Sequence, residues 1–202
     1  MSRACRGQHP GPPSEKLRGV FTVAHLGPAS PISDVIAAAG DTVFRTEDPI
    51  TPDLEADWLV SYGYRHILPQ PVLDAFPDRA INLHISMLPW NRGADPNLWS
   101  IIDGTPRGVT IHYIDAGIDT GPIIGQRKVQ FADDDTLATS YQRLKAAIEE
   151  LFAEWWPTIR EGRAPGHPHI GGGTYHRSSD KASVEHLLTD GWDTPVAVLA
   201  AK

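Results

Sequence analysis

The sequence predicts an α/β fold, with strands alternating with helices over the first two-thirds of the chain. Two observations lead to this prediction. Residues 80–84 alternate between apolar and polar types, which is the period of a strand. Residues 136–160 carry apolar side chains three and four positions apart, which is the period of a helix with one buried face.

The other elements follow from short apolar runs that end at glycine or proline. Strands are expected at 20–26, 42–44, 58–60, 80–84, 108–115 and 123–131, with an extended piece at 67–69, and helices at 30–39, 71–76, 96–102 and 136–160. The acidic run 133–135 supplies the N-cap of the long helix, and Pro157 bends or nearly ends it. Its apolar stripe is Leu137, Tyr141, Leu144, Ile148, Leu151, Phe152, Trp155 and Ile159.

Length and composition narrow the function classes. The chain has 202 residues, enough for about one domain, and its 41% hydrophobic and 21% charged residues are typical of a globular protein. The single cysteine, Cys5, excludes an intrachain disulfide. A net charge of -7 argues against a nucleic-acid partner, because phosphate binding needs a basic face. Without a long apolar run we expect no membrane partner and a cytoplasmic location.

The chain divides into three parts by composition. Residues 1–18 are rich in glycine and proline after two arginines and are expected to form a disordered tail. Residues 19–162 form the main domain, and residues 163–202 form a short C-terminal extension. The segment 171–195 is too short for a domain of its own, so it packs either on its own core or on a partner, which leaves a homodimer possible.

Two polar side chains on the strand at 80–84 point to chemistry. Asn82 and His84 share one face of that strand, since side chains alternate along it. The Asn amide can donate to a developing oxyanion, and His can carry a proton near neutral pH. Such a pair needs an acidic partner, and Asp115 and Asp119 lie in a glycine-rich loop that follows a strand.

The residues around this pair form a series of motifs. They are N-L-H-I-S-M-L-P at 82–89, R-G at 92–93, G-V-T-I-H at 108–112 and D-A-G-I-D-T-G-P-I-I at 115–124. From about Val60 to Val129 the series resembles the folate-dependent formyltransferase family. That resemblance implies a Rossmann-like, mostly parallel sheet with flanking helices, and 10-formyltetrahydrofolate as the cofactor.

The resemblance also implies roles for individual residues. Asn82, His84 and Asp119 match the catalytic triad of the family. His112 matches another recurring position, and we expect it to be a structural histidine of the sheet. The cofactor-binding candidates are Ile67, Leu68, Ser86, Met87, Leu88, Pro89, Asp115 and Gly117, and the substrate-binding candidates are Trp90, Arg92 and Gly93.

Departures from the family pattern narrow the substrate. The stretch before Asn82 is short by one β-α unit, so the N-terminal half is abbreviated. No glycine-rich phosphate loop occurs near Gly27, and no C-terminal barrel fits into residues 160–202. The stretches at 90–93 and 96–99 most resemble formyltransferases that act on surface sugars. The resemblance therefore implies formyl transfer to a primary amine of a small molecule, an amino sugar or nucleotide-linked amino sugar. In the expected mechanism, Asn82 and protonated His84 stabilise the oxyanion, Asp119 accepts a proton, and no metal takes part.

Three alternatives remain open on the sequence. Water in place of the amine would make the protein a 10-formyltetrahydrofolate hydrolase. A metal hydrolase would use His84, His112 and Asp119 as ligands, although no established metal-binding spacing occurs. A non-catalytic folate-binding relative is the third alternative, since the N-terminal half is short.

Overall fold

The computed structural model describes residues 19–201, so the predicted tail at 1–18 lies outside the described residues. Its strands are β1 Thr22–Leu26, β2 Thr42–Thr46, β3 Trp58–Ser61, β4 Ala80–His84, β5 Arg92–Gly93, β6 Gly108–Tyr113, β7 Ile123–Lys128 and β8 Tyr175–His176. Its α-helices are α1 Ile32–Ala38, α2 Gln70–Ala75, α3 Pro96–Ile102, α4 Leu137–Ile159 and α5 Val196–Ala200. The predicted helices are all present, and the extended piece at 67–69 is not a strand.

Six strands form one mixed sheet in the order β2-β1-β3-β4-β6-β7. The pairs among β2, β1, β3 and β4 are parallel, whereas β6 runs antiparallel to both β4 and β7. This arrangement confirms the predicted Rossmann-like α/β class. The abbreviated N-terminal half is visible between β2 and β3, where residues 47–57 connect the strands without a helix.

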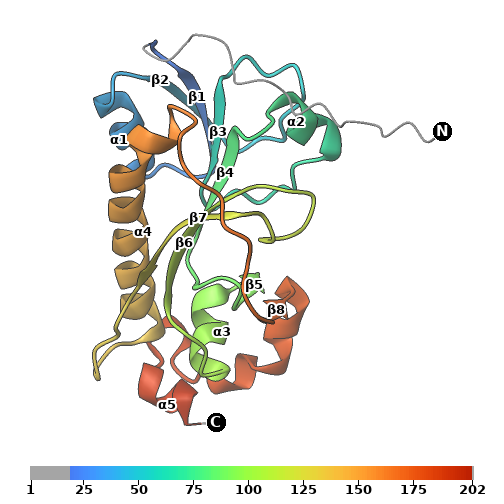
Figure 1. Ribbon diagram of the computed structural model, residues 1–202. Helices are drawn as coiled ribbons and strands as arrows, with labels where there is room; N and C mark the ends of the chain where they lie inside the picture. Colours follow the sequence, from blue (N-terminus) through green and yellow to red (C-terminus); the bar gives the residue numbers. More distant parts are fainter. Residues whose placement is uncertain (1–18, 202) are drawn as a thin grey trace, which may run out of the picture.

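Helices cover both faces of the sheet (Figure 1). On one face, α1 and the long helix α4 pack against alternate residues of the strands, such as Val23, Ile81 and Ile111. On the other face, α2 packs against the intervening residues, such as Ala24 and Leu59. The central strands β1, β3 and β4 are almost entirely buried, as expected for the parallel part of a sheet.

Helix α4 differs from the prediction at its start and on its buried face. Thr136 is the N-cap, and its hydroxyl accepts a hydrogen bond from the backbone N–H of Thr139. The Asp135 carboxylate, expected as the cap, instead accepts hydrogen bonds from the Arg143 side chain. Trp156 is fully buried and Trp155 only partly, so the stripe includes a tryptophan that the predicted periodicity missed.

The C-terminal extension packs on the chain's own core. Leu187, Val196 and Leu199 form one apolar cluster with residues of α3 and the start of α4. The short strand β8 pairs in parallel with β5. Self-packing was one of the two arrangements expected from the sequence, and the homodimer stays a prediction. Within residues 19–201, no helix combines the length and the apolar character needed to cross a membrane.

Candidate active site

The site is built at the end of β4. Asn82 and His84 extend from the same face of this strand, while Ile81 and Leu83 point into the core. Strand β6 lies beside β4 in a register that places His112 opposite Asn82. The sheet therefore brings three polar side chains together before any loop contributes.

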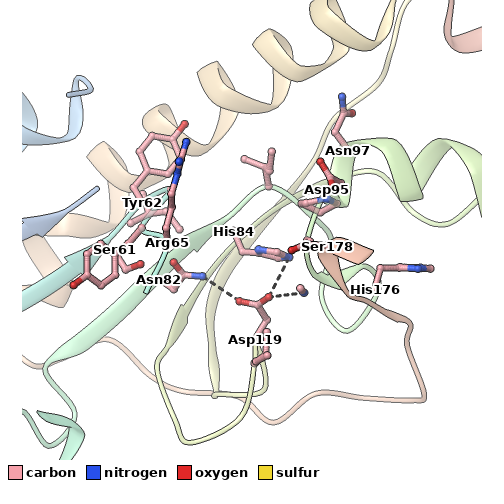
Figure 2. A pocket seen from close by; sticks show the side chains of 18 of the residues that line it. Ser61, Tyr62, Arg65, Asn82, His84, Asp95, Asn97, Asp119, His176 and Ser178 are labelled. Carbon is pink, nitrogen blue, oxygen red and sulfur yellow. Dashed lines mark hydrogen bonds and ion pairs between the residues drawn. The ribbon is translucent and has the colours of Figure 1, made fainter. Parts of the chain in front are cut away.

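Asp119 completes the cluster from the loop that follows β6. Its backbone has a φ of +52°, in the left-handed region that aspartate tolerates better than most residues. One carboxylate oxygen, Oδ1, accepts a hydrogen bond of 3.1 Å from Nδ2 of Asn82. The other, Oδ2, accepts one of 2.8 Å from the backbone N–H of Gly93. Asp119 is thereby fixed from two separate parts of the chain (Figure 2).

Hydrogen bonding sets the proton positions on His84. Nε2 lies 3.0 Å from the backbone carbonyl of Asn91, which can only accept, so Nε2 carries a proton. The same nitrogen lies 3.7 Å from Oδ2 of Asp119. No other described residue engages Nδ1, so in neutral His84 this nitrogen keeps a free lone pair. His84 is therefore equipped to accept a proton.

The pKa directions agree with this role. Burial lowers the pKa of His84 below its ordinary value of 6.5, and the nearby Asp119 opposes that shift without cancelling it. Burial would raise the pKa of Asp119, but the charge of His84, the nearby His112 and the hydrogen bond from the Gly93 N–H outweigh it and lower that pKa. Asp119 therefore remains ionised near neutral pH and is a weak proton acceptor.

His112 belongs to the cluster and is not only a part of the sheet. Its Nδ1 lies 2.7 Å from the carbonyl of Tyr113 and donates to it, so Nε2 of the neutral ring is an acceptor. Nε2 lies 3.3 Å from Nδ2 of Asn82 and 3.4 Å from Oδ1 of Asp119. Both hydrogens of the Asn82 amide are thus engaged, one by Asp119 and one by His112.

The cluster lies midway along a cavity of about 750 Å³, a volume typical of small-molecule sites. Figure 2 shows Ser61, Tyr62 and Arg65 at one end and Asp95, Asn97 and Ser178 at the other, with Asp119 between them. We name these the donor end and the acceptor end. Of the predicted binding residues, Ile67, Leu68, Gly93, Asp115 and Gly117 line the cavity.

The predicted loop at 86–89 does not line this cavity, and neither do Trp90 and Arg92. The Ser86 hydroxyl donates a hydrogen bond of 2.8 Å to the carbonyl of Trp90. The backbone carbonyl of Ser86 accepts a hydrogen bond of 2.7 Å from the hydroxyl of Thr110 in β6. Residues 86–89 thus form a turn after β4 that is hydrogen-bonded to Thr110 of β6, and their cofactor-binding role stays a prediction.

Sequence reasoning missed most of the acceptor end. The missed lining residues are Asp95, Asn97, Tyr141, Tyr175, His176, Arg177, Ser178, Lys181 and Trp192. The presence of Tyr175 and Trp192 in a segment too short to form a domain was the signal available. Among residues 19–201, no group of three or more His, Cys, Asp or Glu side chains is placed to hold a metal ion.

Comparison with known proteins adds independent findings. The sequence model of the formyl transferase family matches residues 48–155. The structure is similar to that of the formyltransferase PseJ from Anoxybacillus kamchatkensis in complex with UDP-4,6-dideoxy-4-formamido-L-AltNAc and tetrahydrofolate. The two share 48% sequence identity with a TM-score of 0.85, over 90% of this chain and 100% of that chain.

Two further structures are more distant. Rv3404c from Mycobacterium tuberculosis, a candidate sugar N-formyltransferase, shares 27% identity with a TM-score of 0.72, over 82% of this chain and 78% of that chain. The N-formyltransferase from Helicobacter canadensis, in complex with folinic acid and dTDP-3-aminofucose, shares 21% identity with a TM-score of 0.65, over 79% and 71% of the two chains. This last likeness concerns the fold alone.

Proposed function

Because the chain belongs to the formyl transferase family, we propose that it transfers the formyl group of 10-formyltetrahydrofolate to the primary amine of a nucleotide-linked amino sugar. The observation that carries this proposal is one continuous cavity with Asn82, His84 and Asp119 between its two ends. A donor bound at one end and an acceptor bound at the other would meet at these side chains. The relative that shares 48% identity was crystallised with ligands of both kinds.

The donor end fits a flat and partly apolar ring. Ile67 and Ile118 leave 77% and 41% of their surface exposed there, whereas Leu68 is buried beneath. Large apolar side chains that are exposed inside a cavity are typical of a ligand-binding surface. Arg65 and Asp115 add charged groups at the same end. When bound, 10-formyltetrahydrofolate supplies the formyl group as the electrophile.

His84 acts as the base in this proposal. Nδ1 of its neutral ring takes the proton that the amine loses as the amine nitrogen bonds to the formyl carbon. As the bond from that carbon to N10 of the folate breaks, protonated His84 would pass this proton on to N10 and return to its neutral form. A positioned base contributes about 10²–10⁴ in rate. Asp119 stabilises the imidazolium that forms, because its carboxylate lies 3.7 Å from Nε2.

These roles revise the expectation from the sequence, in which Asp119 accepts the proton and His84 is already protonated. The lowered pKa of Asp119 makes it a poor base, and burial lowers the pKa of His84 so that its neutral form dominates. Asn82 keeps its proposed role as the donor to the formyl oxygen, worth about 10²–10³ in rate. To fill it, the amide must exchange its 3.3 Å contact with His112 for the substrate.

The experiment incubates the protein with 10-formyltetrahydrofolate and the 4-amino sugar nucleotide that corresponds to the formamido sugar of the PseJ complex. We expect tetrahydrofolate to be released only when the amine is present, and the formylated sugar nucleotide to appear by mass spectrometry. Release without any amine, unchanged when amine is added, would instead identify a hydrolase. Binding of 5-formyltetrahydrofolate without turnover on any amine would identify a non-catalytic relative.

A further inference from the structure

One wall of the acceptor end comes from a segment remote in sequence from the catalytic cluster. We name residues 175–192 the C-terminal wall. Tyr175, His176, Arg177, Ser178, Lys181 and Trp192 of this wall line the cavity. Short 3-10 turns and the two-residue strand β8 make up the wall, so its shape depends on its attachment to the rest of the fold.

That attachment is made next to the catalytic carboxylate. Strand β8 pairs with β5, where the N–H of Ala94 donates a hydrogen bond of 2.9 Å to the carbonyl of His176. The His176 ring stacks on Trp99 with centroids 3.9 Å apart and also lies 2.8 Å from a carboxylate oxygen of Asp103. Gly93, the neighbour of Ala94, holds Asp119. The wall is therefore fixed in register with the catalytic cluster.

The wall presents two cationic side chains to the cavity. Arg177 and Lys181 both line it, and Asp95 is the carboxylate that faces them, with an oxygen 3.7 Å from Nζ of Lys181. Among the described residues, no carboxylate forms an ion pair with the Arg177 guanidinium. Of the charged side chains in the wall, only these two cations line the cavity, whereas Asp180, Glu185 and Asp190 do not. Such a site favours an anionic ligand, and Arg in particular binds phosphate through two parallel hydrogen bonds.

An aromatic surface lies at the same end. Trp192 is 51% exposed, and its ring meets the edge of Tyr141 with centroids 5.5 Å apart at 71°. Both rings line the cavity. This arrangement fits the two parts of a nucleotide. The half-exposed tryptophan ring can stack on a base, and the two cations can bind phosphates.

We infer that the C-terminal wall is the nucleotide subsite of the acceptor, with Arg177 and Lys181 binding its diphosphate and Trp192 contacting its base. This inference rests on the proposed function and assigns residues to it. The sugar would then extend from the diphosphate toward Asp119 and His84, which places its amine at the catalytic cluster. Acceptor recognition and the placing of the Asp119 carboxylate would share the β5–β8 pair.

The test titrates UDP into the full chain by calorimetry and compares Arg177→Gln and Lys181→Gln with the wild type. Each variant is expected to weaken UDP binding about tenfold, because each removes one charge-assisted contact. Uridine, which lacks the diphosphate, should bind far more weakly than UDP to the wild type.

Trp192→Ala is expected to weaken UDP binding about fivefold to tenfold through lost stacking. Arg163→Gln and Lys128→Gln, at exposed positions outside the cavity, serve as matched controls that leave UDP affinity unchanged.

Binding of 5-formyltetrahydrofolate, measured on the same preparations, separates this inference from the proposed function. If the folate binds but UDP does not, or if Arg177→Gln and Lys181→Gln bind UDP as the controls do, the subsite assignment is overturned while the proposed function stands. Uridine that binds as tightly as UDP also overturns it. If neither binding of 5-formyltetrahydrofolate nor formyl transfer is detected, the proposed function itself fails.

Discussion

The two ends of the cavity are built in different ways. The donor end comes from loops that directly follow strands, residues 62–68 after β3 and residues 114–118 after β6. Its exposed side chains at the cavity include Ile67 and Ile118. The acceptor end combines the start of α3, Tyr141 of α4 and the C-terminal wall, which are far apart in the sequence. Its characteristic side chains are charged or aromatic.

This difference shows how one catalytic cluster can serve varied acceptors. The donor end and the catalytic cluster both lie at the ends of strands of the same sheet. A substitution that shifts one of these strands would therefore disturb both the donor end and the cluster. The C-terminal wall is joined to the catalytic carboxylate through β5, and most of its residues lie in short turns. Loops of this kind tolerate sequence change better than strands do. Acceptor choice can therefore change while the donor end and the chemistry are kept.

The sharpest test of the division between chemistry and binding is His84→Ala. We expect kcat/KM for formyl transfer to fall about 10²–10⁴-fold, because the variant lacks the base. Affinity for 5-formyltetrahydrofolate and for UDP should change little, since neither end of the cavity loses a contact. His167→Ala, an exposed histidine outside the cavity, is the matched control and should keep wild-type turnover. Near-normal turnover of His84→Ala would contradict the proposed mechanism.

Gly93→Ala tests the connection between the two ends. Gly93 has a φ of +89°, and an added Cβ would lie 2.3 Å from the carbonyl oxygen of His176. Strain and the opening of the β5–β8 pair should lower the free energy of unfolding by about 1–3 kcal/mol. Turnover should fall as well, because the Gly93 N–H holds Asp119. Thermal denaturation and steady-state kinetics measure both effects.

Gly172→Ala is the control for that substitution. Gly172 lies outside the left-handed region, and no atom lies within 4 Å of its added Cβ. The control should therefore match the wild type in melting temperature and turnover. If Gly93→Ala behaves in the same way, the C-terminal wall is not coupled to the catalytic carboxylate.

Much of the fold could be predicted because its signals are local. The alternation in β4 and the apolar stripe of α4 depend on residues a few positions apart, and both elements formed where expected. The N-cap of α4 was misplaced because the acidic run 133–135 also suits a cap, and the choice depends on where the chain turns. Asp135 is occupied by Arg143, which leaves Thr136 at the helix start.

The residues of the site also fall into those with a sequence signal and those placed by long-range contacts. Asn82, His84 and Asp119 were predicted together from motif order, and the structure brings them within hydrogen-bonding or ion-pair distance. The C-terminal wall was missed, since Arg177 reaches the cavity only through the pairing of β8 with β5, a long-range contact without local pattern. The loop at 86–89 does not line the cavity, and its position in the motif says nothing of which way its side chains turn.

Ile67→Ala tests the donor end alone. Ile67 is 77% exposed in the free protein, so its removal should not destabilise the fold. If the pterin packs on it, affinity for 5-formyltetrahydrofolate should fall about tenfold, the value of a mostly buried aliphatic contact. Affinity for UDP should remain at the wild-type value. Val198→Ala, an exposed aliphatic residue outside the cavity, provides the control. A loss of UDP affinity in Ile67→Ala would contradict the separation of the two ends.

The smallest effect concerns the protonation of His84, which lies between the ends. Burial lowers its pKa in the folded protein, so the neutral ring persists to a lower pH than 6.5, the ordinary value. Asp119 stays ionised over the same range because its pKa is lowered too. An NMR titration of the His84 ring, assigned from the signal that disappears in His84→Ala, should therefore give a midpoint below 6.5. A midpoint above that value would mean that the Asp119 charge outweighs burial. His84 would then be protonated in the resting protein and act as a donor to the formyl oxygen, the role expected from the sequence.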